Sequence, residues 1–215
     1  LTMDQVILEK HCDVVLQESD AILSLAYLNS YFQTGLKNIL DRAILLHSEA
    51  HVDISRYAKV DEIPFDFQRR IMSVIVRTPE GQDRMITKGA PEEIFPRCQQ
   101  FELDGDVFPM EHLYIDELKE EYQQLSADGF RVLAIATKTV ASRGSTPYSR
   151  GDECDLILNG YVDFLDPPKD TAKAAIRALE GHGIHVKVVT GDNDLVARKI
   201  CKEVGLATEF VLLGP

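Results

Sequence analysis

Hydrophobic and polar positions follow a helical spacing in the first quarter of the chain. Apolar residues recur every three or four positions across residues 22–32, after a short strand-like segment at residues 4–11, and this spacing predicts an amphipathic helix. Gly35 interrupts the pattern. A second helix is expected to begin at Asn38, because Asn38 and Asp41 have the residue types and the spacing of a helix cap.

From about residue 58 the pattern changes to short strands bounded by turn residues. The predicted strands span residues 60–63, 72–77, 84–87, 131–136 and 156–165, with a short hairpin over 101–108. Helices are predicted over residues 91–97 and 111–128. Strands joined by tight turns favour antiparallel pairing. This part of the chain is therefore predicted to be an α+β domain in which helices flank an antiparallel sheet.

After Asp166-Pro167-Pro168 the pattern alternates between helix and strand. The expected elements are a helix, a strand, a helix and a strand, at residues 170–179, 184–189, 195–204 and from 210 onward. This βαβ alternation predicts a parallel sheet, here half of a doubly wound, Rossmann-type unit. We therefore expect two parts, which comprise residues 1–165 and residues 166–215.

Composition narrows the possible functions. The 215 residues carry a formal net charge of −12, which argues against a general nucleic-acid binder because phosphate contacts need a basic surface. The four cysteines are far apart and the six histidines lack ligand spacing, so neither a disulfide framework nor a metal site is predicted. No apolar run reaches the roughly 18–20 residues that span a bilayer, and the chain as given is expected to be soluble.

Candidate chemistry begins with Lys88-Gly89-Ala90-Pro91-Glu92. A lysine at the end of a predicted strand, followed by glycine, puts a cation where the backbone could come close to a ligand. Taken singly, Lys88 and Arg131 are more simply interpreted as surface cations at strand ends. In the segment from Phe65 to Met72, two aromatics and two arginines could stack a base and steer phosphates. A core strand with a solvated basic edge is the more common explanation of that segment.

Two further stretches lie near the change of architecture. Thr190-Gly191-Asp192 follows a predicted parallel strand and precedes a helix, where open α/β sheets place phosphate ligands. Asp192 could help to hold Mg²⁺ there, whereas a turn with an ordinary helix cap is equally acceptable. Asp166 followed by two prolines is typical of a stiff linker or a hinge.

Four motifs together resemble the cytosolic ATP-binding region of P-type ion-pumping ATPases. They are, in the family's order, Lys88-Gly89-Ala90-Pro91-Glu92, Gly129-Phe130-Arg131-Val132-Leu133-Ala134, Leu165-Asp166-Pro167-Pro168-Lys169 and Val189-Thr190-Gly191-Asp192. Residues 38–44 and 63–70 are most similar to bacterial magnesium-transporting members. The resemblance implies a nucleotide-binding (N) domain at 1–165 and part of a haloacid-dehalogenase-like phosphorylation (P) domain at 166–215.

The resemblance also assigns roles to single residues. It implies that Phe65 stacks on adenine, that Lys88 lines the depth of the adenine pocket beside Gly89, and that Asp41 lies near the adenine amino group. It further implies that Arg131 and the Thr190-Gly191-Asp192 loop serve the phosphates and that Asp166 is the hinge acid. Arg70 and Met72 complete the expected nucleotide-binding set. Where calcium-pump relatives carry a basic residue this chain has Phe67, which leaves a phosphate contact open.

The function that the resemblance implies is ATP binding, with Mg²⁺, in an ion pump of the inner membrane, this domain lying on the cytoplasmic side. The γ-phosphate would be presented to an aspartate upstream of Leu1, since Leu1-Thr2 resembles the end of the motif that carries this nucleophile. No catalytic residue and no ATPase activity are therefore expected in this chain alone. The expected partners are ATP and the pump's phosphorylation, actuator and transmembrane domains, with no nucleic acid, and the chain is expected to be monomeric. Alternatives are a soluble haloacid-dehalogenase-type phosphatase, a silent interaction domain, or a pump for a cation other than magnesium.

Overall fold

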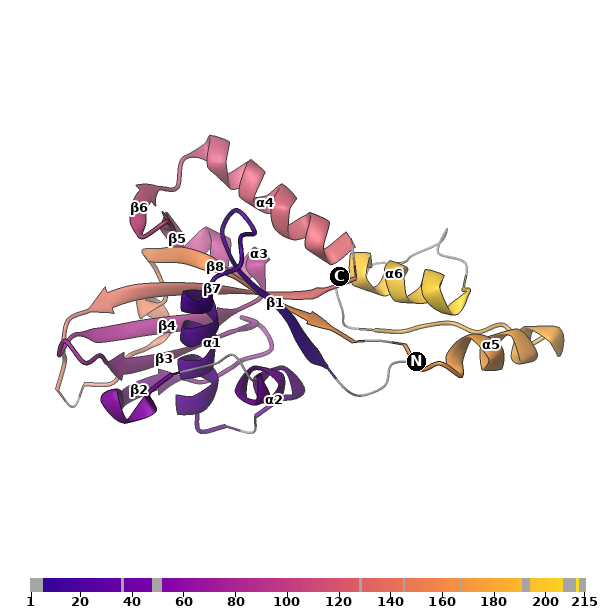
Figure 1. Cartoon of the computed structure of the whole chain (residues 1–215), viewed down its shortest axis with the longest axis horizontal. Helices are drawn as coiled ribbons and strands as arrows, with labels where there is room; N and C mark the ends of the chain where they lie inside the picture. Colours follow the sequence, from indigo (N-terminus) through magenta and orange to yellow (C-terminus); the bar gives the residue numbers. More distant parts are fainter. Residues whose placement is uncertain are drawn as a thin grey trace.

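The computed structural model describes residues 6–35, 37–47, 52–127, 129–144, 146–166, 168–190, 194–206 and 212. One eight-stranded sheet dominates this structure (Figure 1). Its strands are β1 (Ile7–Asp13), β2 (Ala58–Ile63), β3 (Ile71–Arg77), β4 (Asp83–Gly89), β5 (Cys98–Leu103), β6 (Asp106–Pro109), β7 (Arg131–Val140) and β8 (Leu156–Leu165). They lie in the order β2-β3-β4-β7-β8-β5-β6, and β1 also pairs with β8. The α+β class is thus confirmed.

The sheet is mixed, which corrects the prediction that it is antiparallel throughout. β5 runs parallel to β8, whereas the other neighbouring strands are antiparallel. β8 is long enough for two partners to share it: β5 pairs with its first residues, 156–158, and β1 with residues 160–165. At Gly160, the first residue of β8 to pair with β1, a Cβ atom would lie 2.1 Å from the carbonyl oxygen of Cys12. Glycine is therefore required where β1 joins β8.

Helices cover both faces of the sheet (Figure 1). The helices are α1 (Asp20–Phe32), α2 (Ile39–Leu46), α3 (Pro91–Ile94) and α4 (His112–Ala127), with 3₁₀ turns η1 (Ile54–Arg56), η2 (Phe95–Arg97) and η3 (Arg150–Asp152). Met72, Val74 and Val76 pack in a core with α1 and α2. Ile71 and Ile75 face a second core that includes residues of α3 and α4. Burial on both faces explains why β3 is a nearly continuous apolar run.

The predicted cap of α2 is confirmed. The backbone N–H of Asp41 donates to the Asn38 side chain at 2.9 Å, and the backbone N–H of Asn38 donates to Asp41 Oδ2 at 3.2 Å. This reciprocal pair satisfies two amide groups that the helix itself leaves without partners. It also fixes the first turn of α2, so that the Asp41 side chain points toward the sheet and is 2% exposed.

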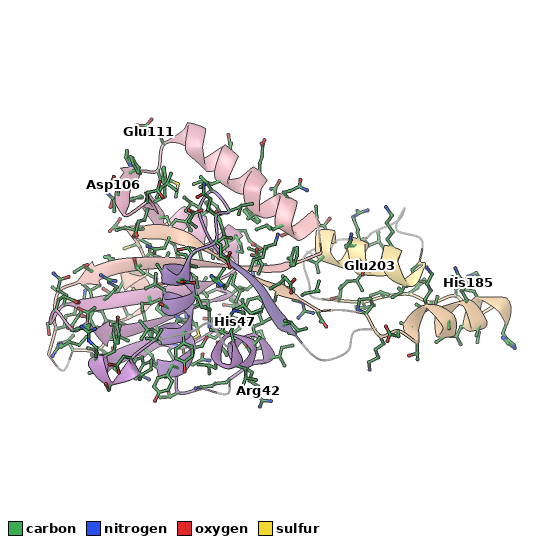
Figure 2. All side chains as sticks on the ribbon, viewed as in Figure 1. Arg42, His47, Asp106, Glu111, His185 and Glu203 are labelled. Carbon is green, nitrogen blue, oxygen red and sulfur yellow. The ribbon has the colours of Figure 1, made fainter. Side chains whose placement is uncertain are left out.

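The last part of the chain holds α5 (Ala172–Gly181) and α6 (Asp194–Val204). Ala172, Ile176 and Val204 of these helices form a separate small cluster. Figure 2 shows His185 and Glu203 in this part, at a distance from Arg42 and His47 near α2. None of the described helices is long and apolar enough to cross a membrane.

The strand predicted over residues 184–189 is not formed. Residues 184–190 lie outside every helix and strand of the described structure. Val189 is 98% exposed and Ile184 is 51% exposed. β-branched residues favour extended backbone, but a strand also requires a hydrogen-bonded neighbour. The parallel half-unit predicted for this part therefore stays a prediction, and the strand expected from residue 210 lies mainly outside the described residues.

Candidate functional site

Lys88 lies inside β4 and is buried, which corrects its interpretation as a surface cation at a strand end. β4 continues through Gly89, and the Lys88 side chain is only 4% exposed beneath α1 and α2. Its Nζ donates to Asp41 Oδ1 at 2.5 Å and to Ser30 Oγ at 2.6 Å. Ser30 Oγ in turn donates to Asp41 Oδ1 at 2.9 Å. The three side chains form a closed polar triangle within an apolar core.

The electrostatics of this triangle are those of a buried ion pair. Burial by itself would raise the pKa of Asp41, but the charge of Lys88 and hydrogen bonds from Lys88, Gln33 and Ser30 lower the pKa below its ordinary value. Burial lowers the pKa of Lys88, and the attraction of Asp41 opposes that effect. Asp41 is therefore ionised at neutral pH and holds the ammonium group in one position.

Met72 and Gly89 are tied to Lys88 through the pairing of β3 with β4. Met72 is the cross-strand partner of Lys88, and Ile71 that of Gly89. Met72 is 6% exposed and packs in the core beneath α1 and α2. A Cβ atom on Gly89 would lie 2.4 Å from the Arg70 carbonyl oxygen and 2.5 Å from Ile71 Cγ2. The structure thus explains Gly89 by its close packing against β3, whereas the sequence suggested approach of a ligand.

Phe65 and Phe67 form an exposed aromatic pair on the turn that leads into β3. The Phe65 side chain is 48% exposed and that of Phe67 is 90% exposed. Their rings meet edge to face, with centroids 5.4 Å apart and an interplanar angle of 85°. Exposed aromatic rings of this kind can stack on a planar base. The turn is joined to the Lys88 strand end by a hydrogen bond from the Ala90 N–H to the Arg70 carbonyl oxygen, at 3.1 Å.

Arg70 ends the turn with a left-handed backbone, φ 51°. Its guanidinium group lies between Glu92 and Glu93 of α3, at 2.9 Å and 3.0 Å. The Glu93 hydrogen bond is the largest contribution that raises the pKa of Arg70. Two carboxylates thus already neutralise Arg70, and a phosphate would have to compete with them for this cation.

Arg131 and Asp166 are brought together by β7 and β8. Arg131 is the first residue of β7 and Asp166 directly follows β8. Arg131 Nη2 lies 3.1 Å from Asp166 Oδ2, and the Asp166 side chain is 4% exposed. Thr190 is exposed in the segment between α5 and α6. Gly191 and Asp192 lie outside the described residues.

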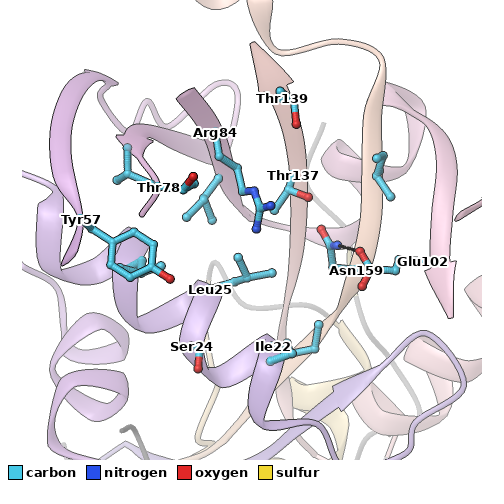
Figure 3. A pocket seen from close by; sticks show the side chains of 15 residues that line it. Ile22, Ser24, Leu25, Tyr57, Thr78, Arg84, Glu102, Thr137, Thr139 and Asn159 are labelled. Atoms are coloured by element: carbon cyan, nitrogen blue, oxygen red, sulfur yellow. Dashed lines mark hydrogen bonds between the residues drawn. The ribbon is translucent and has the colours of Figure 1, made fainter. Parts of the chain in front are cut away.

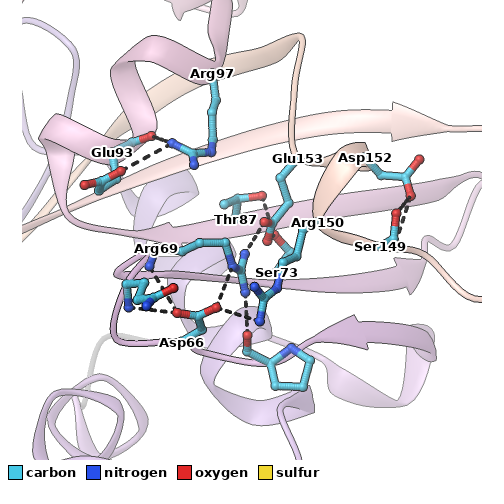
Figure 4. A network of polar contacts seen from close by, with 12 residues as sticks. Asp66, Arg69, Ser73, Thr87, Glu93, Arg97, Ser149, Arg150, Asp152 and Glu153 are labelled. Carbon is cyan, nitrogen blue, oxygen red and sulfur yellow. Dashed lines mark hydrogen bonds and ion pairs between the residues drawn. The ribbon is translucent and has the colours of Figure 1, made fainter.

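A polar network on the opposite face of β3 was missed from the sequence. It joins the Phe65 turn to the segment between β7 and β8 (Figure 4). Its members are Asp66, Arg69, Ser73, Thr87, Arg150 and Glu153. Ser73 and Thr87 are cross-strand partners within otherwise apolar strands. A hydroxyl residue in each of two predicted apolar strands was the available signal, because buried hydroxyls need polar partners.

A cavity of about 380 Å³ lies on the α1 face, toward the beginning of β4. Figure 3 shows Arg84, Thr137 and Asn159 on its walls, with Tyr57 and Leu25. Its lining includes none of the residues predicted to bind nucleotide. Among the described residues, no three or more His, Cys, Asp or Glu side chains are grouped so that they could hold a metal ion.

The family model of the P-type ATPase cytoplasmic domain N matches residues 13–171, which include strands β2 to β8, α1 to α4 and most of the candidate residues. The chain belongs to the P-type ATPase family. The resemblance inferred from the four motifs is therefore confirmed.

Named relatives give the family match more detail. The chain is 45% identical over its whole length to the "Magnesium-transporting ATPase, P-type 1" of Escherichia coli K12 and to the protein of the same name from Salmonella typhimurium 14028s. It is 38% identical, over 70% of its length, to "Calcium-transporting ATPase 1" of Lactococcus lactis. The chain spans 24% of the length of each magnesium-transporting relative.

Proposed function

We propose that this chain binds ATP with Mg²⁺ and presents the γ-phosphate to an aspartate that is not part of its sequence. The observation that carries the proposal is the exposed Phe65 ring on a turn bonded to the strand end that holds the Lys88–Asp41 pair. An aromatic surface for a base, next to a fixed cation and a fixed carboxylate, has the chemistry to recognise adenine. We assign residues 1–165 to the N domain and 166–215 to part of a haloacid-dehalogenase-like P domain.

Each predicted residue has a role in this proposal. Phe65 stacks on the base, with Phe67 extending the apolar wall, and the buried Lys88–Asp41 pair lies at the depth of the base site. Arg131 contacts the phosphates, either by leaving Asp166 or by binding Asp166 and a phosphate together. Met72 and Gly89 act indirectly, by shaping the strand end. Arg70 contributes only if a phosphate displaces Glu92 and Glu93 from its guanidinium group. Thr190, Gly191 and Asp192 complete the phosphate side.

The intact protein is proposed to be an ATP-driven pump in the inner membrane, with this chain on the cytoplasmic side and joined to phosphorylation, actuator and transmembrane domains. Magnesium is proposed as the transported ion, because the relatives named for magnesium match the whole chain at 45% identity, whereas a calcium-named relative matches 70% of it at 38%. Uptake of Mg²⁺ against Ca²⁺ by the intact protein in vesicles tests this choice. The family membership leaves the soluble phosphatase alternative without support.

ATP titration of the isotope-labelled chain, followed by backbone amide shifts, tests the binding proposal. We expect a dissociation constant on the order of 0.1–1 mM, with shifts at Phe65, Gly89 and Arg131. Phe65→Leu should weaken binding about tenfold, since base stacking contributes roughly 1–3 kcal/mol. Phe108→Leu is the matched control, because Phe108 is a similarly exposed aromatic, at 41%, on the distant β6. Equal affinities in the two variants would refute the adenine site.

A further inference from the structure

Contacts of a single arginine, Arg69, hold the turn that carries Phe65. The Arg69 guanidinium donates to the Pro64 carbonyl oxygen at 2.6 Å and lies 3.5 Å from Asp66 Oδ2. Asp66 Oδ1 accepts the backbone N–H groups of Gln68 and Arg69 at 2.7 Å and 3.2 Å. Arg69 thus contacts the residue before Phe65 and the residue after it.

Arg69 is in turn held by Glu153, a carboxylate with no solvent-exposed side-chain surface. Glu153 Oε2 pairs with Arg69 Nη1, and Glu153 Oε1 accepts a hydrogen bond from Ser73 Oγ at 2.7 Å. Ser73 Oγ shares a hydrogen bond of 2.8 Å with Thr87 Oγ1. One carboxylate therefore ties the aromatic turn to the paired strands β3 and β4 (Figure 4).

A second link runs beside the first. Arg150 Nη2 lies 2.7 Å from Asp66 Oδ2. The Arg150 side chain is 68% exposed, so this link can be removed without emptying a buried site. Arg150 and Glu153 both belong to the segment between β7 and β8, and Glu153 is 84 residues from Arg69 in the sequence. The aromatic turn is thus fixed by a distant part of the chain.

We propose that Glu153 is a positioning residue that sets the place and rigidity of the Phe65 ring through Arg69. The proposal rests on the nucleotide-binding function above. Phe65 is half exposed and has Phe67, itself 90% exposed, as its ring neighbour, so core packing does not hold the ring. A buried carboxylate–guanidinium pair is often no more stabilising than apolar residues of the same shape. Fixing the turn before the base arrives lowers the entropy lost on binding.

The test uses the fact that the chain has no tryptophan. Phe65→Trp places one fluorophore on the turn, and its nanosecond anisotropy reports the freedom of the ring without nucleotide. Glu153→Gln in this background keeps a hydrogen-bonding side chain of the same size but removes the charge that Arg69 requires. We expect faster and wider motion of the introduced indole ring. In the chain with native Phe65, Glu153→Gln should raise the ATP dissociation constant about three- to tenfold.

Asp83→Asn is the matched control. Asp83 is a buried carboxylate, with 1% of its side chain exposed, and pairs with Arg77 at 2.8 Å at the opposite end of the β3–β4 hairpin. Its loss should lower stability but leave the motion of the indole ring and the ATP affinity unchanged. Arg150→Gln should produce a smaller change than Glu153→Gln in the same direction, and it keeps the test decisive if Glu153→Gln does not fold.

Two results would overturn the proposal. One is motion of the indole ring that is the same with Glu153→Gln and Arg150→Gln as in the parent Phe65→Trp chain. The other is greater motion without a loss of ATP affinity in a protein whose ATP binding is weakened by Phe65→Leu. Failure of the nucleotide function is a different result: Phe65→Leu would leave ATP binding unchanged while Glu153→Gln still increased the motion of the indole ring.

Discussion

Lys88→Met removes the cation from a carboxylate that water does not reach. The Lys88 and Asp41 side chains are 4% and 2% exposed, and Nζ lies 2.5 Å from Oδ1. Attraction at this distance is of the same order as the several kcal/mol lost when each ion leaves water. Removing Lys88 leaves the free-energy cost of burying the Asp41 carboxylate without the attraction that offsets it. We therefore expect Lys88→Met to lower the free energy of unfolding by about 3–5 kcal/mol, with Asp41→Asn having a similar effect.

The double variant distinguishes an ion pair from two independent contacts. Lys88→Met combined with Asp41→Asn leaves no buried charge at this position. It should be less destabilised than Lys88→Met alone, so that the coupling free energy is at least about 2 kcal/mol. Lys59→Met and Glu62→Gln form a control cycle, because Lys59 and Glu62 also meet at 2.7 Å but their side chains are 27% and 18% exposed. Coupling of about 0.2–1 kcal/mol is expected there.

The pH dependence gives a second measure of the same pair. Because the folded-state pKa of Asp41 is lowered, its contribution is present above the unfolded pKa and is lost as pH falls through the folded pKa. Without Lys88 the remaining large influence is burial, which raises the pKa of Asp41. The stability of Lys88→Met should therefore increase as pH falls from 7 toward 5.

Urea unfolding followed by far-ultraviolet circular dichroism, at pH 5 and pH 7, measures all four chains of each cycle. Single-variant effects that add to within about 0.5 kcal/mol in the Lys88–Asp41 cycle would refute the coupled pair. If Lys88→Met instead loses stability as pH falls from 7 to 5, Lys88 is not what keeps the pKa of Asp41 low.

Three further predictions follow from buried or closely packed groups. Burial raises the pKa of Asp163 to about 7, opposed by Lys10, so the protonated carboxyl favours folding at low pH and this contribution is lost as pH rises through 7. Asp163→Asn should therefore be more stable than the parent at pH 8 by up to about 4 kcal/mol, and a difference in the free energy of unfolding, measured in urea, that does not grow from pH 5 to pH 8 would contradict this. Gly89→Ala should lower the melting temperature through a cost of about 1–3 kcal/mol, because its Cβ would meet the Arg70 carbonyl oxygen at 2.4 Å, whereas Gly151→Ala, 3.7 Å from Ser149 Oγ, should have little effect. Asn38→Ala removes the α2 cap and should cost about 1 kcal/mol in the same assay; an unchanged melting temperature would show that the cap is dispensable.

Local signals in the sequence were sufficient for much of the fold. The type and spacing of Asn38 and Asp41 predicted the cap that the structure contains. The strands predicted over residues 72–77 and 84–87 pair as the β3–β4 hairpin, and the short hairpin predicted over residues 101–108 is formed by β5 and β6. Each of these features is decided by residues a few positions apart, where turn chemistry and side-chain periodicity act directly.

Features that depend on residues far apart in the sequence could not be predicted from local patterns. Taken singly, Lys88 was interpreted as a surface cation, because its partners, Ser30 and Asp41, precede it by 58 and 47 residues. The parallel pairing of β5 with β8 joins segments more than 50 residues apart, and β1, from the other end of the chain, pairs with the same strand. Glu153 lies in a polar loop that gives no local sign of its burial. The extended segment at residues 184–190 shows the opposite error, since its composition favours a strand but no strand forms.

The two buried ion pairs have one location in common. Lys88–Asp41 lies on the α1–α2 face and Arg69–Glu153 on the other, and both flank the point where β3 begins and β4 ends. Apolar residues of similar shape could serve the fold at least as well, so stability alone does not account for two such pairs at one strand end. Under the proposed function they act together: one holds an ammonium and a carboxylate at fixed positions, and the other holds the aromatic turn beside them. The ion pair and the aromatic turn are then already ordered in the folded protein, and the binding of a base does not have to compensate the entropy lost in ordering them.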